Sequence, residues 1–166
     1  MGTSEAFLLA FAAQWSHPSY PPVKVDPAEL QAAEATLGVR LPEDYKTAIL
    51  SVGLPFPSLA LLSAISDHSI DLHALSELRA PKEIVEETVG WREIGLPDNF
   101  VVIGNDFSGN KFCFDVADLQ GDAVASAPVY FWDHDFDDVQ LVASSFPEWI
   151  GSYLGEWSAD LSYKDF

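Results

Sequence analysis

The residues best suited to chemistry in this sequence follow one another from Val129 to Asp138, where four bulky residues precede a group of four aspartates and one histidine. Valine, tyrosine, phenylalanine and tryptophan favour strands, so we expect the acidic group just beyond a strand end. Such a group could bind a metal ion, transfer protons or attract a basic partner. The rest of the chain has to decide between these three possibilities.

The spacing of the aspartates loosely resembles a calcium loop, because Asp133, Asp135 and Asp137 occupy alternate positions. A loop of the EF-hand type also needs a glycine at its sixth position and a bidentate glutamate at its twelfth. Counted from Asp133, these positions hold Asp138 and Ser144. The sequence therefore predicts an acidic loop between two strands, with no metal ion and no cofactor.

His134 is the candidate general base of an active site, since it stands between two carboxylates. No Gly-x-Ser-x-Gly motif accompanies it, and Cys113 alternates within an expected strand as a small core residue would. His68 and His73 flank Asp71, but their spacing on an expected strand does not place both on one face. These patterns indicate that the protein is not an enzyme.

The charge balance is strongly acidic, with 26 aspartates and glutamates against eight lysines and arginines, for a net charge of −18. Such a field repels nucleic acid and anionic membranes and attracts a basic protein or a cation. From Asp98 to Asp138 there are nine aspartates and one lysine, so much of the acid belongs to the second half. The alternative is that the charge serves solubility alone.

Length and composition indicate one globular domain with a sizeable core, because 48% of the 166 residues are hydrophobic. The single cysteine excludes an internal disulfide and favours a reducing compartment. Glu5 precedes a short apolar run that lacks the basic residues of a signal peptide, and the run is too short to span a bilayer. We therefore expect a cytoplasmic protein.

Helices are expected in the first half. Thr3 or Ser4 should cap a helix to Trp15, and Asp26 should cap another that ends at Gly38, with Glu29 completing a capping box. Further helices are expected at 42–52 and at 81–91, the latter with Glu83, Glu86 and Glu87 in water. Residues 54–66 show no clear period, and 69–72 alternate like a short strand.

The second half predicts consecutive strands at 100–104, 111–116, 129–132 and 139–142. The glycine-bearing segment 104–110 lies between two of them, which favours a hairpin loop over a phosphate site. Ser145 should cap a last helix. Helices followed by consecutive strands predict an α+β fold with a mostly antiparallel sheet.

Three stretches in this order resemble the SMI1/KNR4, or SUKH, superfamily: LGVRLPEDYKTAIL, LPDNFVVIGNDFSGNKFCFDV and PVYFWDHDFDDVQLVASSFPEWI. The resemblance covers residues 26–154, and Ser51-Val52-Gly53 departs from the Asn-Gly that usually ends the family's second helix. It implies an SMI1/KNR4-like domain at 26–166; the N-terminal helix and Pro-rich linker expected at 1–25 lie outside the resemblance. The fold that it implies is also α+β, with helices packed around a mostly antiparallel sheet.

The members of this family have binding functions. Its bacterial members are chiefly immunity proteins that neutralise toxins, many of them nucleases, and its fungal members are regulatory scaffolds; neither group is catalytic. The resemblance therefore implies an intracellular antitoxin that binds a basic toxin domain, or else a scaffold without a toxin partner. The oligomeric state stays open.

The acidic loops are the expected binding surface for that partner. Their position beside rigid strands suits recognition. Aromatic residues are core by default, but those that face outward among aspartates would add apolar contact area; the candidates are Phe107, Phe131, Trp132, Phe136, Trp149 and Trp157. The expected partner-binding residues are Asp106, Asp133, Asp135, Asp137 and Asp138, with Glu43 and Asp44 as further contributors.

Overall fold

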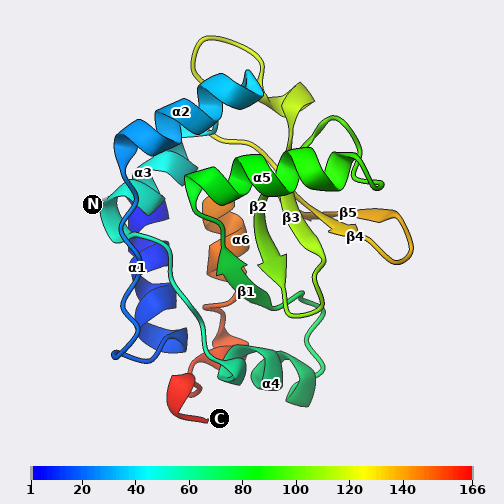
Figure 1. The fold of residues 1–166 in the computed structure, drawn as a ribbon. Helices are drawn as coiled ribbons and strands as arrows, with labels where there is room; N and C mark the ends of the chain where they lie inside the picture. Colours follow the sequence, from blue (N-terminus) through cyan, green and yellow to red (C-terminus); the bar gives the residue numbers. More distant parts are fainter. Residues whose placement is uncertain (1, 166) are drawn as a thin grey trace.

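The computed structural model describes residues 2–165, which form six α-helices and a five-stranded antiparallel sheet (Figure 1). The helices are α1 (Thr3–Trp15), α2 (Pro27–Leu37), α3 (Glu43–Val52), α4 (Leu59–Asp67), α5 (Pro81–Arg92) and α6 (Phe146–Ser152). The strands are β1 (Leu75–Leu78), β2 (Phe100–Asp106), β3 (Lys111–Asp115), β4 (Val129–Asp133) and β5 (Asp138–Ala143). The α+β class is confirmed, and the four strands predicted in the second half are β2 to β5.

The strands follow one another across the sheet in sequence order, each antiparallel to its neighbour. In the register of the middle pair, Lys111 at the start of β3 lies opposite Trp132 near the end of β4. The β2–β3 and β4–β5 turns therefore leave the sheet at the same end. This topology brings together aspartates that are far apart in the sequence.

The two faces of the sheet are covered unequally. On one face, Val101, Phe112 and Phe131 belong to a large core that includes residues of α1, α3, α4 and α6. On the other face, Val102 and Cys113 belong to a smaller buried cluster beneath α5, which crosses in front of the strands in Figure 1. Among the strands, helix α5 packs mainly on β2, and the first four residues of β5 are exposed.

Helix α1 is an integral part of the large core, although it precedes the stretch that resembles the family. Leu8, Phe11 and Trp15 are fully buried, and α1 packs on α3 and α6. The Trp15 indole donates a hydrogen bond of 3.1 Å to the carbonyl of Tyr153. The predicted side-chain cap is wrong, because the helix begins at Thr3 without one.

The capping predictions are otherwise confirmed with one exception. The Asp26 carboxylate accepts from the N–H of Ala28 at 2.8 Å, and Ser145 caps α6. Glu29 does not complete a capping box, however. Its carboxylate instead lies 3.5 Å from the ammonium of Lys82 on α5, because α2 packs against that helix.

Two elements between 54 and 78 differ from prediction. Helix α4 was hidden because Leu59 and Leu62 are exposed, so that apolar residues outside its buried stripe obscure the helical period. The strand predicted at 69–72 is wrong. Ser69 has a φ of +52°, and the N–H of Ile70 donates back to α4, so this segment is the turn that ends the helix. The strand starts later, at Leu75, where β1 pairs with β2.

Candidate functional site

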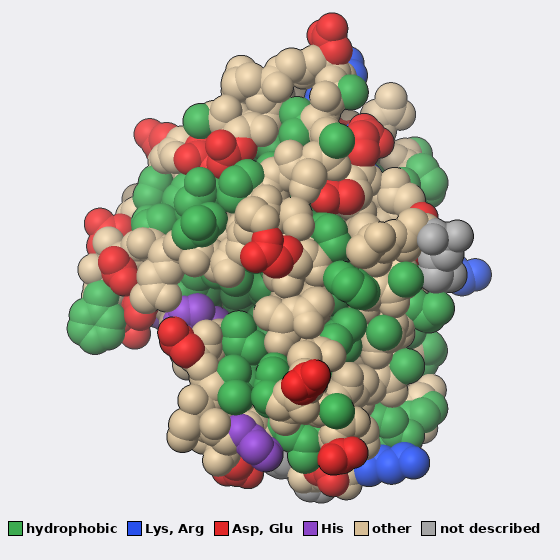
Figure 2. All heavy atoms as spheres, turned by 180° about the vertical axis from the view of Figure 1, so that it is seen from behind, with side chains coloured by type: hydrophobic (Ala, Val, Ile, Leu, Met, Phe, Trp, Pro, Cys, Tyr) green, Lys and Arg blue, Asp and Glu red, His purple; other side chains and the backbone are tan. Residues whose placement is uncertain are grey.

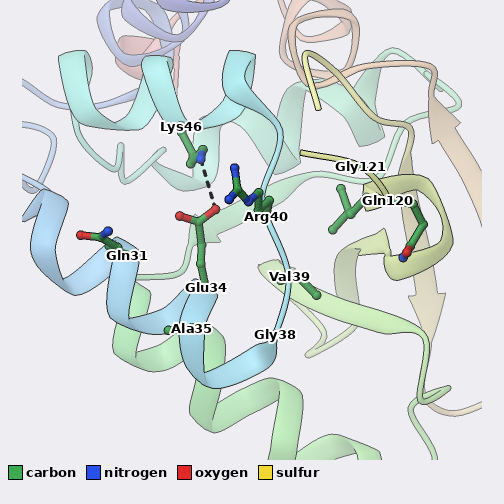
Figure 3. Close-up of a pocket in the computed structure, with 10 residues that line it drawn as sticks. Gln31, Glu34, Ala35, Gly38, Val39, Arg40, Lys46, Gln120 and Gly121 are labelled. Carbon is green, nitrogen blue, oxygen red and sulfur yellow. Dashed lines mark hydrogen bonds and ion pairs between the residues drawn. The ribbon is translucent and has the colours of Figure 1, made fainter. Parts of the chain in front are cut away.

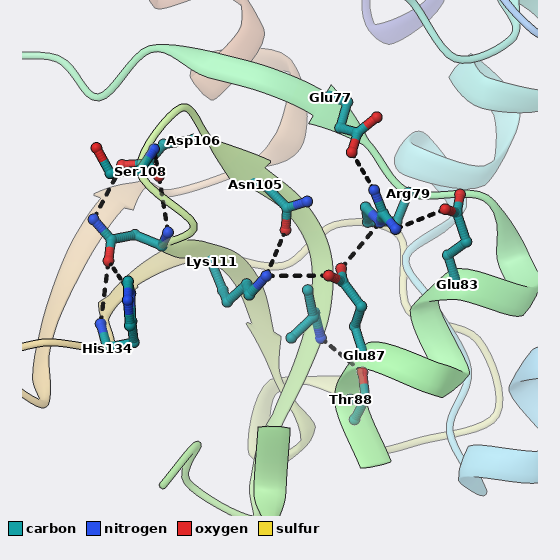
Figure 4. Close-up of polar contacts among 12 residues, drawn as sticks. Glu77, Arg79, Glu83, Glu87, Thr88, Asn105, Asp106, Ser108, Lys111 and His134 are labelled. Carbon is teal, nitrogen blue, oxygen red and sulfur yellow. Dashed lines mark hydrogen bonds and ion pairs between the residues drawn. The ribbon is translucent and has the colours of Figure 1, made fainter. Parts of the chain in front are cut away.

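Five of the predicted partner-binding residues gather at the sheet end where the β2–β3 and β4–β5 turns meet. We call this set the acidic end: Asp106, Asp133, Asp135, Asp137 and Asp138. The two turns are joined through Asn110, whose side-chain oxygen accepts from the backbone N–H of His134 at 3.2 Å and lies 2.6 Å from its Nδ1 (Figure 4). The acidic end is therefore one surface held by two hairpins.

Asp106 shapes the β2–β3 turn. Its Oδ1 accepts from the N–H groups of Ser108 and Asn110, each at 2.8 Å, and its Oδ2 accepts from the Asn110 side chain at 3.1 Å (Figure 4). A carboxylate with these partners stabilises a turn in the same way as an Asx motif. Asp106 thus has a structural role besides any role in binding.

The β4–β5 turn also depends on its aspartates. Asp133 Oδ1 accepts from the N–H groups of Asp135 and Phe136. Asp137 has a φ of +49°, a conformation that aspartate tolerates better than most residues, and it accepts from the Trp132 indole at 2.9 Å. The carboxylate of Asp135 is exposed and lies 3.3 Å from the Nε2 of His134.

An aromatic side chain is exposed among these carboxylates. Phe136 is 83% exposed, whereas Phe131, Trp132 and Trp149 are buried and Phe107 is half-buried. Figure 2, turned by 180°, shows acidic and hydrophobic side chains together at the projecting end on its left, with Lys and Arg away from it in this view. Of the aromatic candidates, Phe136 is the one placed for contact with a partner.

Glu43 and Asp44 lie apart from the acidic end, at the start of α3. Their backbone N–H groups donate to the carbonyls of Val124 and Ala125. Glu43 pairs with Lys46 at 3.2 Å. Burial raises the pKa of Asp44 above its ordinary value, and hydrogen bonds partly offset this effect. The structure therefore does not bring these two residues to the surface where the other five gather.

Three side chains of the β4–β5 turn could approach a single cation. Asp133, His134 and Asp135 can each offer one ligand atom, and these atoms lie within 4.8 Å of one another. Calcium takes six to eight oxygen ligands, and Asp133 Oδ1 already holds the turn. This donor set falls short of a calcium site, and the absence of metal stays a prediction.

Sequence reasoning missed a network of buried charges under α5. Lys111 Nζ lies 3.1 Å from Glu87 Oε1 and donates to the Asn105 side chain at 3.0 Å (Figure 4). Arg79 on the other side of Glu87 lies 3.0 Å from its Oε2 and 2.6 Å from Glu83. The prediction that Glu87 faces water is wrong. Both cations are therefore held in ion pairs within the protein.

The signal for this network was weak but present. Glu83 and Glu87 are four residues apart on one helix, so their side chains share a face. Lys111 begins a strand in which the next residues, Phe112 and Cys113, are buried on opposite faces. Neither face of this strand is exposed, so the lysine side chain has no route to water. A lysine in such a strand has to meet a carboxylate.

A cavity of about 640 Å³ lies away from the acidic end, between α2, the start of α3 and the 3₁₀ turn Val116–Leu119 (Figure 3). Its charged residues are already partnered. Glu34 accepts from Lys46 at 3.1 Å and from the N–H of Leu41, and Arg40 donates to the carbonyl of Asp122. The Glu34, Lys46 and Arg40 side chains in its lining therefore already have partners within the protein.

Cys113 and His73 do not have the surroundings of a catalytic nucleophile and its base. Cys113 is fully buried in β3, and burial raises the pKa of its thiol, which disfavours the reactive thiolate. His73 is stacked on Phe131 with ring centroids 3.6 Å apart, and its Nε2 lies 2.8 Å from the Gln140 side chain. Its contacts are those of a packing residue.

Comparison with protein families finds a match over most of the chain. Residues 24–152 match the SMI1 / KNR4 family (SUKH-1), close to the range over which the sequence resembles it. None of the curated proteins compared with the chain matches it. In residues 2–165 no helix is both long enough and apolar enough to cross a membrane. Because the match spans most of its residues, the chain belongs to the SMI1/KNR4 family (SUKH-1).

Proposed function

We propose that this protein is a non-catalytic immunity protein that binds a basic toxin domain, such as a nuclease, in the cytoplasm and neutralises it. Membership of the SUKH-1 family supports a binding function of this type. The observation that carries the proposal is the acidic end, where exposed carboxylates surround the exposed ring of Phe136 on a projecting hairpin. An apolar anchor with a charged rim is a common form of tight protein interface.

Electrostatics favour a basic partner over other macromolecules. The net charge is −18, and several of the few cations are paired inside the protein, as Lys111, Arg79 and Lys46 are. Complementary charge raises association rates by about 10- to 1,000-fold. Fast association suits an antitoxin, because neutralisation has to precede damage to the cell.

The acidic end is a better candidate for the interface than the start of α3. Asp135 and Asp138 are exposed and carry their charge on a hairpin that the sheet holds in place. Glu43 is paired internally and Asp44 is half-buried, so they present less charge to a partner. We therefore assign partner binding to the acidic end and give Glu43 and Asp44 at most a peripheral part.

The decisive experiment is purification of the protein from its native cell, followed by identification of what accompanies it. The proposal expects a basic protein whose isolated toxic domain is inactivated when the two are mixed in equal amounts. A partner that is a signalling enzyme, with no toxic domain, would instead establish a regulatory scaffold. A gene beside this one for a large secreted protein with a variable C-terminal domain would support the antitoxin function.

A further inference from the structure

Strand β5 has a free edge. It is the last strand of the sheet, and its main contacts are with β4 and with α6, which follows it. The outward N–H and C=O groups of an edge strand can pair with another chain, and proteins commonly guard such edges with lysine, proline or a bulge. Asp138–Ala143 contains neither lysine nor proline. Its one register shift lies at the far end, where Val142 is the extra residue between Leu141 and Ala143.

An apolar strip leads from the interior of the sheet to this edge. Val139 lies opposite the buried Trp132 and Leu141 lies opposite the half-buried Tyr130, so that these four side chains share the face that α5 covers elsewhere. Leu141 is 64% exposed. We call Tyr130, Val139 and Leu141 the edge strip.

Carboxylates stand at both ends of the edge strip. Asp137 and Asp138 of the acidic end precede Val139 at one end. At the other end, burial raises the pKa of Tyr130, and the negative charges of Asp118 and Asp115 raise it further. Lys111, which lies opposite Trp132 two strands from the edge, is paired with Glu87. The edge is therefore apolar in the middle and acidic at both ends.

We propose that the free edge of β5 receives an extended cationic segment of a protein partner as a sixth strand of the sheet. Main-chain hydrogen bonds would supply affinity, alternate apolar side chains would cover the edge strip, and lysines or arginines would meet the flanking carboxylates. The cationic character of this segment rests on the proposed function, whereas the strand addition rests on the geometry of β5. A second copy of this chain is a poor occupant, because two chains that each carry −18 repel one another.

The test is an NMR titration of the isotope-labelled full chain, at low salt, with the peptide acetyl-Lys-Val-Lys-Val-Lys-Val-Lys-amide. One control peptide has the same sequence with every residue N-methylated, which removes the N–H donors along both edges, so that it cannot pair in either strand direction. Another has four lysines followed by three valines, which keeps charge and composition but not the alternation. Strand addition predicts shift changes and slowed amide exchange concentrated in residues 138–143, with both controls about tenfold weaker.

Two protein variants separate the edge from general attraction. The V139K/L141K variant guards the edge and should bind about tenfold more weakly. The V89K/L50K variant adds the same charge at exposed apolar positions outside the sheet and should weaken binding much less. Equal affinity for all three peptides, with shifts spread over every acidic loop, would overturn the proposal, as would no binding at all. Neither result touches the toxin assignment, which co-purification tests separately.

Discussion

Lys111 Nζ and Glu87 Oε1 lie 3.1 Å apart beneath helix α5, and the lysine side chain is only 4% exposed. The same ammonium lies 4.7 Å above the Trp91 ring and donates to Asn105. A buried lysine is tolerated only when its charge is paired and its donors are satisfied. This contact joins β3 to α5 and fixes how the helix lies over the smaller buried cluster.

Lys111→Met should lower the free energy of unfolding by about 3 kcal/mol, because Glu87 would keep its charge in a half-buried place with one cation fewer. Urea denaturation at neutral pH measures the change. Lys82→Met is the matched control, since its pair with Glu29 is exposed and should contribute less than about 1 kcal/mol. Equal losses in the two variants would show that the buried pair contributes no more than a surface pair.

Trp15→Ala should destabilise the protein by about 3–5 kcal/mol, since it empties a fully buried indole site and removes a hydrogen bond to Tyr153. Leu9→Ala on the exposed side of the same helix is the control and should cost less than about 1 kcal/mol. Thermal or urea unfolding of both variants measures the difference. A Trp15→Ala protein as stable as the wild type would mean that α1 is separable from the domain.

The sequence was most informative where the period was regular and the caps were explicit. Alternation in β3 and β4 and the caps Asp26 and Ser145 act locally, so they are visible without the fold. Helix α4 and strand β1 were missed because both depend on tertiary contacts that the local sequence pattern does not show. Exposed leucines blur the period of α4, and β1 is defined by its pairing with β2 rather than by its own pattern.

The candidate site was predictable in composition but not in geometry. Counting aspartates found the acidic end, and the antiparallel order of the strands brought its two turns together. Nothing in the counting distinguishes Asp106, which holds a turn, from Asp135, which is exposed. The free edge of β5 was also invisible, because it depends on strand order across the whole sheet.

Asp44→Asn should change how stability depends on pH. Burial raises the folded-state pKa of Asp44 above its ordinary 3.8, so the carboxyl contributes stability below pH 3.8 and loses it as pH rises through the folded value. The free energy of unfolding of the wild type, relative to the variant, should therefore fall as the pH rises above the ordinary pKa of 3.8 and through the higher folded-state pKa. Asp160→Asn, at an exposed position, is the control for the loss of one charge. A wild-type-to-variant difference that is constant with pH would refute the prediction.

Millimolar Ca²⁺ or a chelator should leave the melting temperature nearly unchanged, because the acidic loop lacks the ligand number of a calcium site. A native-state site at 100 times its dissociation constant would add about 2.7 kcal/mol and raise the melting temperature by several degrees. A rise of that size, lost in the Asp135→Ala variant, would establish a calcium site at this turn, because Ca²⁺ takes oxygen ligands. A small rise unaffected by that variant would reflect screening of the net charge.

Asp→Asn changes at 135, 137 and 138 together should slow association with the cognate basic partner about tenfold at low salt, because rim charges act mainly on the association rate. The fold should survive, since asparagine also tolerates the positive φ of Asp137 and its side-chain oxygen can still accept from Trp132. Stopped-flow mixing at several salt concentrations measures the rates.

The matched control for this triple variant is D67N/E86Q/D160N, which removes the same three charges from exposed positions away from the acidic end. If the charges act only through the net field, both variants should slow association equally at low salt, because at distances that are large compared with the protein the field depends on its total charge. A larger effect at the acidic end places the encounter there. Rates insensitive to all six substitutions and to salt would mean that the aspartates serve solubility and that an apolar surface such as the edge strip does the binding.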